Sequence, residues 1–211
     1  MFCFADATGE ALAGLLRPGN AGANTLDDHV AVLDAAIGQL PEPVAAGHRP
    51  GDEPATVARG VRVRVDSAGC STPLARACRD RNVGFSMVAR SNRQIHTAIS
   101  RALDDPDRWL PAVTQSREIK DDATVAEVTD LVDLSAWPAG TRLIVRRRPL
   151  HPGARTTLFP DRDYRYWGHY TDNSLGDPML LDADIRAPRP CRGPHPTAQN
   201  VRAGQISVLR P

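Results

Sequence analysis

Lysine is nearly absent from this chain: Lys120 is the only one, and the other 25 basic residues are arginine. Arginine codons are GC-rich and lysine codons are not, so a GC-rich coding sequence explains the bias most simply. A second interpretation is selection for the planar guanidinium, which suits phosphate better than an ammonium group does. The formal net charge is only +1, so the total charge gives no argument for a nucleic-acid partner.

Cysteine is also scarce, and the spacing of the four residues includes no CxxC pair and no neighbouring histidine pair. This excludes the usual structural zinc sites and favours reduced thiols. The chain has no apolar run of transmembrane length and no signal-peptide pattern, so we expect a cytoplasmic protein without a membrane partner. It also lacks the phosphate-loop, dinucleotide-binding, HExxH and GxSxG motifs.

The remaining composition, 41% hydrophobic and 24% charged, is that of an ordinary globular protein. The apolar spacing predicts a helix over residues 26–40, with Thr25 as its N-cap. Alternating residues 61–66 predict a strand, and a helix capped at Ser71 or Thr72 then runs through residue 81. A strand over 83–89 and a helix over 93–103 complete an α/β pattern.

From residue 109 to 172 the pattern becomes β-rich, with strands expected over 125–134, 141–148 and 164–171. The Pro/Gly-rich residues 41–54 predict a linker. They include the metal-capable side chains that start at His48, and we interpret this stretch as an exposed loop. The proline-rich residues 187–211 predict coil rather than a closing element of a domain.

Asp66 is the strongest candidate for chemistry that the residues alone indicate. It follows a predicted strand and enters a turn of small residues and a helix, which is where α/β folds place their ligands. An aspartate is a suitable oxygen ligand for Mg²⁺ or Mn²⁺. The alternative is a structural role in an Asx turn or helix cap, and the residue alone favours that alternative.

Basic and aromatic residues accumulate in the β-rich part. The run Arg146, Arg147 and Arg148 ends a predicted strand, where arginines can contact phosphates. An edge strand protected by solvated charges is an equally good interpretation. Tyr164, Tyr166, Trp167 and Tyr170 could stack on bases, although packing of the β-rich lobe is the simpler explanation.

Several stretches resemble one family of transposases. They read ATGEALAGLLRPGNAGANTLDDHVAVLDAAIGQL, VRVRVDSAGC, RDRNVGFSMVAR, DLSAWPAGTRLIVRRRPLHPGA and YRYWGHYTD. In this order, and over roughly residues 4–186, they resemble the DDE group 1 transposases of the insertion-sequence 1380 family. The resemblance implies an incomplete ribonuclease H-like core in residues 1–105 and a β-rich insertion in 106–172. It also implies a return to the core in 173–187.

The family's activity is DNA transposition by two-metal phosphodiester cleavage and strand transfer, with Mg²⁺ or Mn²⁺ held by three acidic residues. Asp66 in VDSAGC matches the second acid and would be both catalytic and metal-binding. We expect the first acid to belong upstream of Met1, and the third to belong to a helix motif that does not follow residue 187. The resemblance also implies DNA contacts by Arg142 and by Arg146, Arg147 and Arg148.

Residues 188–211 are expected to be an out-of-frame, disordered tail. Shifting the reading frame by one base permits RAHAHVEDHIR from residue 186 onward, close to the family's third-acid motif. We therefore expect a transposase-derived fragment that has lost catalysis. The alternative is a non-catalytic remnant that binds element-end DNA or regulates full-length transposase, and salt-dependent DNA binding would favour it. An unrelated metal-dependent hydrolase would need a second acid near Asp66, for which Asp6 and Glu10 are the early candidates.

Overall fold

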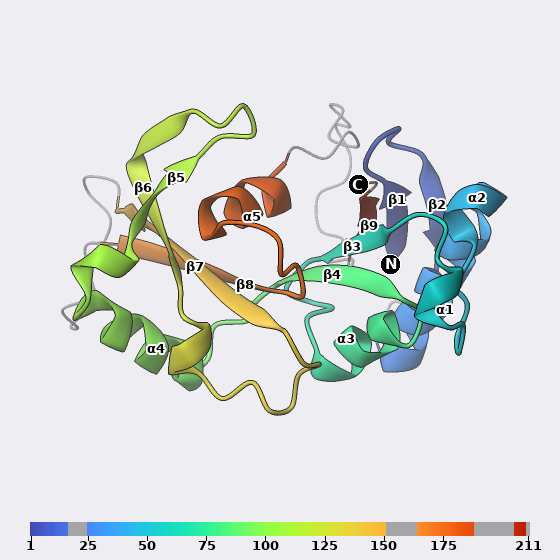
Figure 1. Ribbon diagram of the computed structural model, residues 1–211, viewed down its shortest axis with the longest axis horizontal. Helices are drawn as coiled ribbons and strands as arrows, with labels where there is room; N and C mark the ends of the chain where they lie inside the picture. Colours follow the sequence, from blue (N-terminus) through green and yellow to red (C-terminus); the bar gives the residue numbers. More distant parts are fainter. Residues whose placement is uncertain (17–24, 151–163, 188–204, 210–211) are drawn as a thin grey trace. The chain divides into compact units, whose positions relative to one another are not determined.

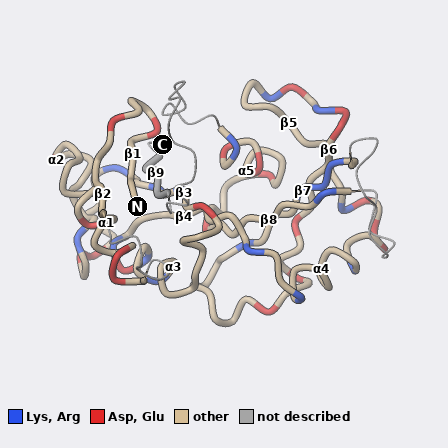
Figure 2. The backbone as a smooth tube through the Cα atoms, turned by 180° about the vertical axis from the view of Figure 1, so that it is seen from behind, with Lys and Arg blue, Asp and Glu red and all other residues tan. Residues whose placement is uncertain are grey.

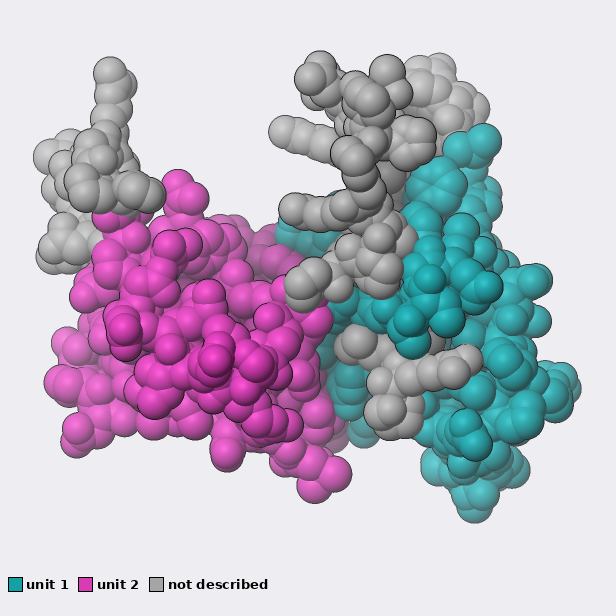
Figure 3. Space-filling view, turned by 90° about the horizontal axis from the view of Figure 1, so that it is seen from above, with its two compact units in different colours: residues 1–87, 188–211 teal, residues 88–187 magenta. Residues whose placement is uncertain are grey.

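The computed structural model describes residues 1–16, 25–150, 164–187 and 205–209 of the chain. They form two compact units: unit 1 comprises residues 1–87 with 188–211, and unit 2 comprises residues 88–187 (Figure 3). This division differs from the boundaries at 105/106 and 172/173 that the resemblance implies, and those boundaries stay a prediction. The helices on either side of the β-rich segment fall within unit 2 (Figure 1). The structure is mixed α/β, as the sequence predicts.

Unit 1 is built on a sheet whose strands follow the order β2-β1-β9-β3-β4. The strands are β1 (Phe2–Ala5), β2 (Ala11–Gly14), β3 (Val61–Val65), β4 (Val83–Val88) and β9 (Gln205–Leu209). The β1–β2 pair is antiparallel and the β3–β4 pair is parallel. Strand β9 runs parallel to β1 and antiparallel to β3, so β1 and β3 run in opposite directions.

Strand β9 corrects part of the expectation for the C-terminal tail. Residues 188–204 and 210–211 lie outside the described residues, but Gln205–Leu209 forms a strand between β1 and β3 rather than coil. The segment QISVL alternates apolar and polar residues and contains two β-branched residues, a pattern that fits a strand. Strand β9 lies between β1 and β3 and pairs with both of them. It thereby provides hydrogen-bond partners for the backbone N–H and C=O groups on the facing edges of these two strands.

One face of this sheet is covered by helices α1 (Leu26–Gly38) and α3 (Thr72–Arg79). The predicted cap of α1 is confirmed: the Thr25 side chain accepts a hydrogen bond from the backbone N–H of Asp28, and the Asp28 carboxylate accepts one from that of Thr25. Ser71 caps α3: its side chain accepts a hydrogen bond from the backbone N–H of Leu74. The core beneath these helices is apolar, with Leu33, Leu74, Val63 and Phe85 almost fully buried.

The expected linker is more ordered than its composition indicates. It contains the short helix α2 (Glu42–Ala45), and His48 is 1% exposed rather than on the surface. The two ring nitrogens of His48 lie 3.0 and 2.8 Å from the carbonyl oxygens of Arg81 and Arg59. The interpretation of His48 as part of an exposed loop is therefore wrong, because tertiary contacts fix the segment against the end of α3.

Unit 2 contains the strand order β8-β7-β6-β5, all antiparallel. The strands are β5 (Leu110–Val113), β6 (Ile119–Glu127), β7 (Arg142–Pro149) and β8 (Tyr164–Thr171). The last two confirm the prediction closely. Strand β6 begins and ends earlier than the strand predicted over residues 125–134. The sequence did not predict β5 as a separate strand. Short 3-10 helices stand at Pro54–Thr56 in unit 1 and at Pro106–Arg108 and Thr129–Leu131 in unit 2.

Two helices cover opposite faces of the unit 2 strands (Figure 1). Helix α4 (Arg93–Leu103) lies on the face of Trp109, whose indole N–H donates to the carbonyl of Ala102. Helix α5 (Pro178–Ile185) packs on β5, β6 and β7 from the other side. Within the described residues, no helix has both the length and the apolar character needed to cross a membrane.

Candidate functional site

Asp66 follows the last residue of β3, at the edge where the parallel strands β3 and β4 end. Its Oδ1 accepts hydrogen bonds from the backbone N–H groups of Ala68 and Gly69, at 3.0 and 3.2 Å. This is the geometry of an Asx turn, which the sequence left open as the alternative to metal binding. One oxygen of the only carboxylate matched to the family is thus used to shape the turn into α3.

The Asp66 turn is packed tightly against α1. A Cβ atom added at Gly69 would lie 2.5 Å from Cγ1 of Val65 and 2.8 Å from Nε2 of His29, so no larger residue fits there. His29 is 4% exposed, and its Nδ1 lies 2.8 Å from the carbonyl oxygen of Thr25. Its Nε2 has no hydrogen-bond partner among the residues that the structure describes. The sequence predicted α1 but did not indicate His29 as a functional residue. His29 lies three and four residues before Val32 and Leu33, and this helical spacing predicts only that the three side chains share the buried face of the helix.

The early acid Asp6 is remote from Asp66. The strand register places Cys3 level with Val65 and Ala5 level with Val63, through β9. Asp6 therefore lies near the beginning of β3, about four residues or ~13 Å along the strand from Asp66. Its carboxylate is instead 2.6 Å from Nη2 of Arg64, which is 1% exposed. The structure thus gives Asp6 a structural ion pair and removes the basis for an unrelated hydrolase that uses both acids.

The described residues do not fit a two-metal centre. They contain no group of three or more histidine, cysteine, aspartate or glutamate side chains arranged to hold a metal ion. Mg²⁺ needs several oxygen ligands in an octahedral arrangement, and a pair of ions needs carboxylates from more than one segment. Asp66, with one oxygen engaged in its turn, does not meet that requirement.

The arginines of β7 do not form one surface, although the sequence grouped them as DNA contacts. Arg146 is 6% exposed and donates from Nη1 to Oδ2 of Asp182 at 2.7 Å, inside unit 2. Arg142 donates to Glu127 and to the carbonyls of Asn173 and Gly176. This hydrogen bond from Arg142 lowers the pKa of Glu127 below its usual value. These contacts hold both guanidinium groups within unit 2.

Arg147 and Arg148 point to opposite sides of β7, as neighbours in a strand do. The Arg147 guanidinium lies 4.0 Å from the ring centre of Trp109 and 5.0 Å from that of Tyr164. Arg148 is about half exposed and pairs with Asp122 at 2.6 Å. Of the four arginines assigned from the sequence, Arg148 is the most exposed, near the end of β7. Figure 2 shows basic positions in blue along β7.

Aromatic side chains of unit 2 mostly pack within it, as the simpler interpretation held. Trp137 stacks on Tyr170 with ring centres 4.0 Å apart, and Trp109 lies 6.4 Å from Tyr166. Trp167 differs because its neighbours are charged: the guanidinium carbons of Arg165 and Arg186 lie 5.8 and 5.2 Å from its ring centre. The sequence indicated Trp167 but not these two arginines.

Two further buried groups have shifted acidities. Burial lowers the pKa of His169 to about 4, so its ring is neutral near pH 7. Burial, with a smaller effect of Asp6, raises the pKa of the Cys3 thiol to about 12, which makes it a poor nucleophile. Among the described residues, Cys3, Cys70 and Cys78 form no disulfide bond.

Comparison with the sequence patterns of known protein families finds no match to this chain, and comparison with curated proteins finds none.

Proposed function

We propose that this chain derives from a DDE-type transposase, and that in its present form it binds DNA without cleaving it. The observation that carries the proposal is the setting of Asp66. It occupies the strand end at which the family places its second acid, yet the structure provides no cluster of three potential metal ligands among the described residues. Two-metal cleavage requires such a set of carboxylates, so a lone acid in a turn does not supply it.

The topology of unit 1 supports a ribonuclease H-like origin. An antiparallel hairpin, β1–β2, lies on one side of β9, and the parallel pair β3–β4 with α3 as its crossover lies on the other. Asp66 stands at the crossover, where open α/β sheets place their ligands. The same strand end would carry a catalytic carboxylate in an active member of the family.

The test is a direct measurement of Mn²⁺ binding together with DNA nicking. The purified chain should bind no pair of Mn²⁺ ions in calorimetric titration and should leave a labelled duplex intact in Mg²⁺ or Mn²⁺. Asp66→Ala should change neither result. Binding of two Mn²⁺ ions per chain, or nicking that Asp66→Ala abolishes, would show that a complete acidic site exists and would overturn the proposal.

DNA binding is the second part of this proposal, and it is tested separately. The exposed Arg148, at the end of a strand rich in arginine, supports a sequence-tolerant contact with phosphates. Affinity for a labelled duplex should then fall steeply between low and moderate salt, because each phosphate contact releases counterions. Equal affinity at both salt concentrations, or none at low salt, would contradict it.

A further inference from the structure

The end of the β7–β8 ladder in unit 2 places two arginines directly opposite each other. Arg148 in β7 pairs with Arg165 in β8, and Arg146 pairs with Trp167 in the same ladder. Residues opposite each other point to the same face, as do residues two apart in a strand. Arg148, Arg165 and Trp167 therefore share one face, the face on which Arg146 meets Asp182 of α5.

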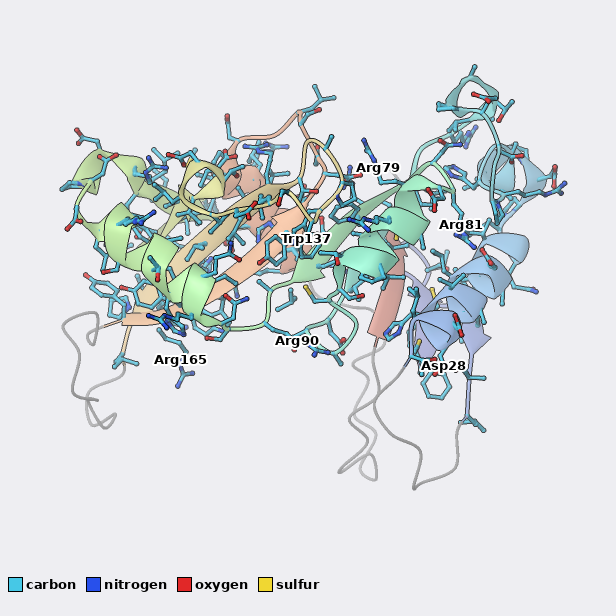
Figure 4. The ribbon with its side chains drawn as sticks, turned by 90° about the horizontal axis from the view of Figure 1, so that it is seen from below. Asp28, Arg79, Arg81, Arg90, Trp137 and Arg165 are labelled. Atoms are coloured by element: carbon cyan, nitrogen blue, oxygen red, sulfur yellow. The ribbon has the colours of Figure 1, made fainter. Side chains whose placement is uncertain are left out.

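A third exposed guanidinium reaches this place from α5. Arg186, at the C-cap of the helix, lies 5.2 Å from the Trp167 ring centre, and Arg165 lies 5.8 Å from it. The side chain of Arg186 is 35% exposed and that of Arg148 is 53% exposed. Arg165 is exposed too, and its side chain is labelled in Figure 4. We call Arg148, Arg165 and Arg186, gathered about Trp167, the Trp167 arginine cluster.

The charges of this face are not balanced by the described acids. Asp182 is shared between Arg146 and Arg186, at 2.7 and 2.9 Å, and Asp122 pairs with Arg148 at 2.6 Å. Four guanidinium groups thus have two carboxylates between them. Like charges directly opposite each other in a sheet destabilise it. An anion bound between Arg148 and Arg165 would relieve that repulsion.

We propose that the Trp167 arginine cluster is the DNA-backbone binding site of this chain, in which Arg148, Arg165 and Arg186 contact phosphates and Trp167 holds two of the guanidinium groups in place. The proposal rests on the proposed DNA partner. It keeps Arg148, which the sequence indicated, and adds Arg165 and Arg186, which the sequence did not indicate. Guanidinium groups match phosphate oxygens with paired hydrogen bonds. Because phosphates carry no sequence information, binding through this site is independent of base sequence.

The opposite face of the same ladder supplies the contrast. There Arg147 is enclosed by Trp109 and Tyr164 and donates to the hydroxyl of Thr124, so its guanidinium is held by the fold. Tyr164 is 37% exposed and begins β8 next to Arg165. If DNA bases stacked on the face of Tyr164, replacing this residue would weaken DNA binding. If phosphates bind to the face of Trp167, replacing Tyr164 would leave DNA binding unchanged.

The experiment measures how the affinity for a labelled duplex depends on salt, by fluorescence anisotropy of the full chain. Each phosphate contact contributes a slope of about −0.9 to a plot of log affinity against log salt concentration. Changing Arg148, Arg165 and Arg186 together to Gln should reduce the slope by about three times that amount. Arg165→Gln alone should reduce it by about one contact, and Tyr164→Ala should leave it unchanged.

A matched triple control changes three exposed basic residues elsewhere in unit 2, Arg93, Arg101 and Lys120, to Gln. It loses the same charge and should retain most of the slope. The assignment would be overturned if the cluster variant kept the wild-type salt slope, or if the control variant lost as much of the slope as the cluster variant. Either result would leave the proposed DNA binding itself in place. Absence of any binding by the wild type would remove the DNA partner as well. Should the triple variant unfold, as judged by circular dichroism, Arg165→Gln decides, because no ion pair holds Arg165 among the described residues.

Discussion

Both units contain a strand in which arginines stand among aliphatic residues, VRVRV in β3 and RLIVRRRP in β7, and both bury one of those arginines, but they do so with different partners. In unit 1, Arg64 of β3 is paired with Asp6, which follows β1. In unit 2, Arg146 of β7 is paired with Asp182, which belongs to the covering helix α5. The Asp6 side chain is 10% exposed and that of Asp182 is 2% exposed. The acid of unit 2 is therefore the more completely removed from water, whereas the side chain of Arg64, at 1%, is less exposed than that of Arg146, at 7%.

The two pairs show what arginine in a strand means in a mixed α/β protein. The sequence of the strand does not decide whether the arginine meets water. A partner carboxylate from another element can turn the face of that arginine into an interior. Because the acid of unit 2 is the less exposed of the two, we expect unit 2 to depend more strongly on its acid, and the following changes measure how large the difference is.

The largest effect is expected from Asp182→Ala in unit 2. It would leave Arg146 buried without its partner, which typically costs about 3–5 kcal/mol of folding free energy. Urea unfolding followed by tryptophan emission measures this directly, because Trp109, Trp137 and Trp167 all lie in unit 2. The double change Arg146→Met with Asp182→Leu should recover most of the loss. A single variant as stable as the wild type would show that Arg146 does not need its acid.

A smaller effect is expected from Asp6→Ala in unit 1. Arg64 would lose a charged hydrogen-bonding partner, at a cost of about 2–3 kcal/mol, because water can reach the partly exposed site of Asp6. Unit 1 contains neither tryptophan nor tyrosine, so hydrogen exchange of the β3 amides is the appropriate measurement. Exchange as slow as in the wild type would show that Arg64 does not need Asp6. A loss of stability larger than that of Asp182→Ala would show that unit 1 depends more strongly on its acid than unit 2 does.

A third effect is a dependence of stability on pH that His169 gives to unit 2. Burial lowers the pKa of His169 to about 4 in the folded state, against about 6.5 when unfolded. A group whose pKa is depressed by folding contributes stability above its unfolded pKa, and this contribution is lost as the pH falls from 6.5 towards 4. His169→Gln should flatten that part of the stability profile, measured by urea unfolding at pH 7, 5.5 and 4. A profile as steep as that of the wild type would assign the dependence to other groups.

Local patterns were sufficient for most elements near the middle of the chain. Thr25 and Ser71 cap their helices as predicted, and α4, β7 and β8 lie within one residue of the expected bounds. These elements depend on capping side chains and on apolar spacing, both of which are local properties. The prediction was poorer where the partner was distant. Strand β9 and the buried His48 depend on contacts with segments far away in the chain.

For the candidate site, the sequence by itself determined the position of Asp66 at a strand end, because an alternating strand, a turn of small residues and a capped helix follow one another directly. It also determined that basic and aromatic residues share β7 and β8. Only the tertiary structure decided that Asp66 shapes an Asx turn, that Asp6 lies near the other end of β3, and that Arg142 and Arg146 are held inside unit 2. The reason is physical: the role of a charged side chain depends on which opposite charge the fold places within reach and on whether water can reach the pair.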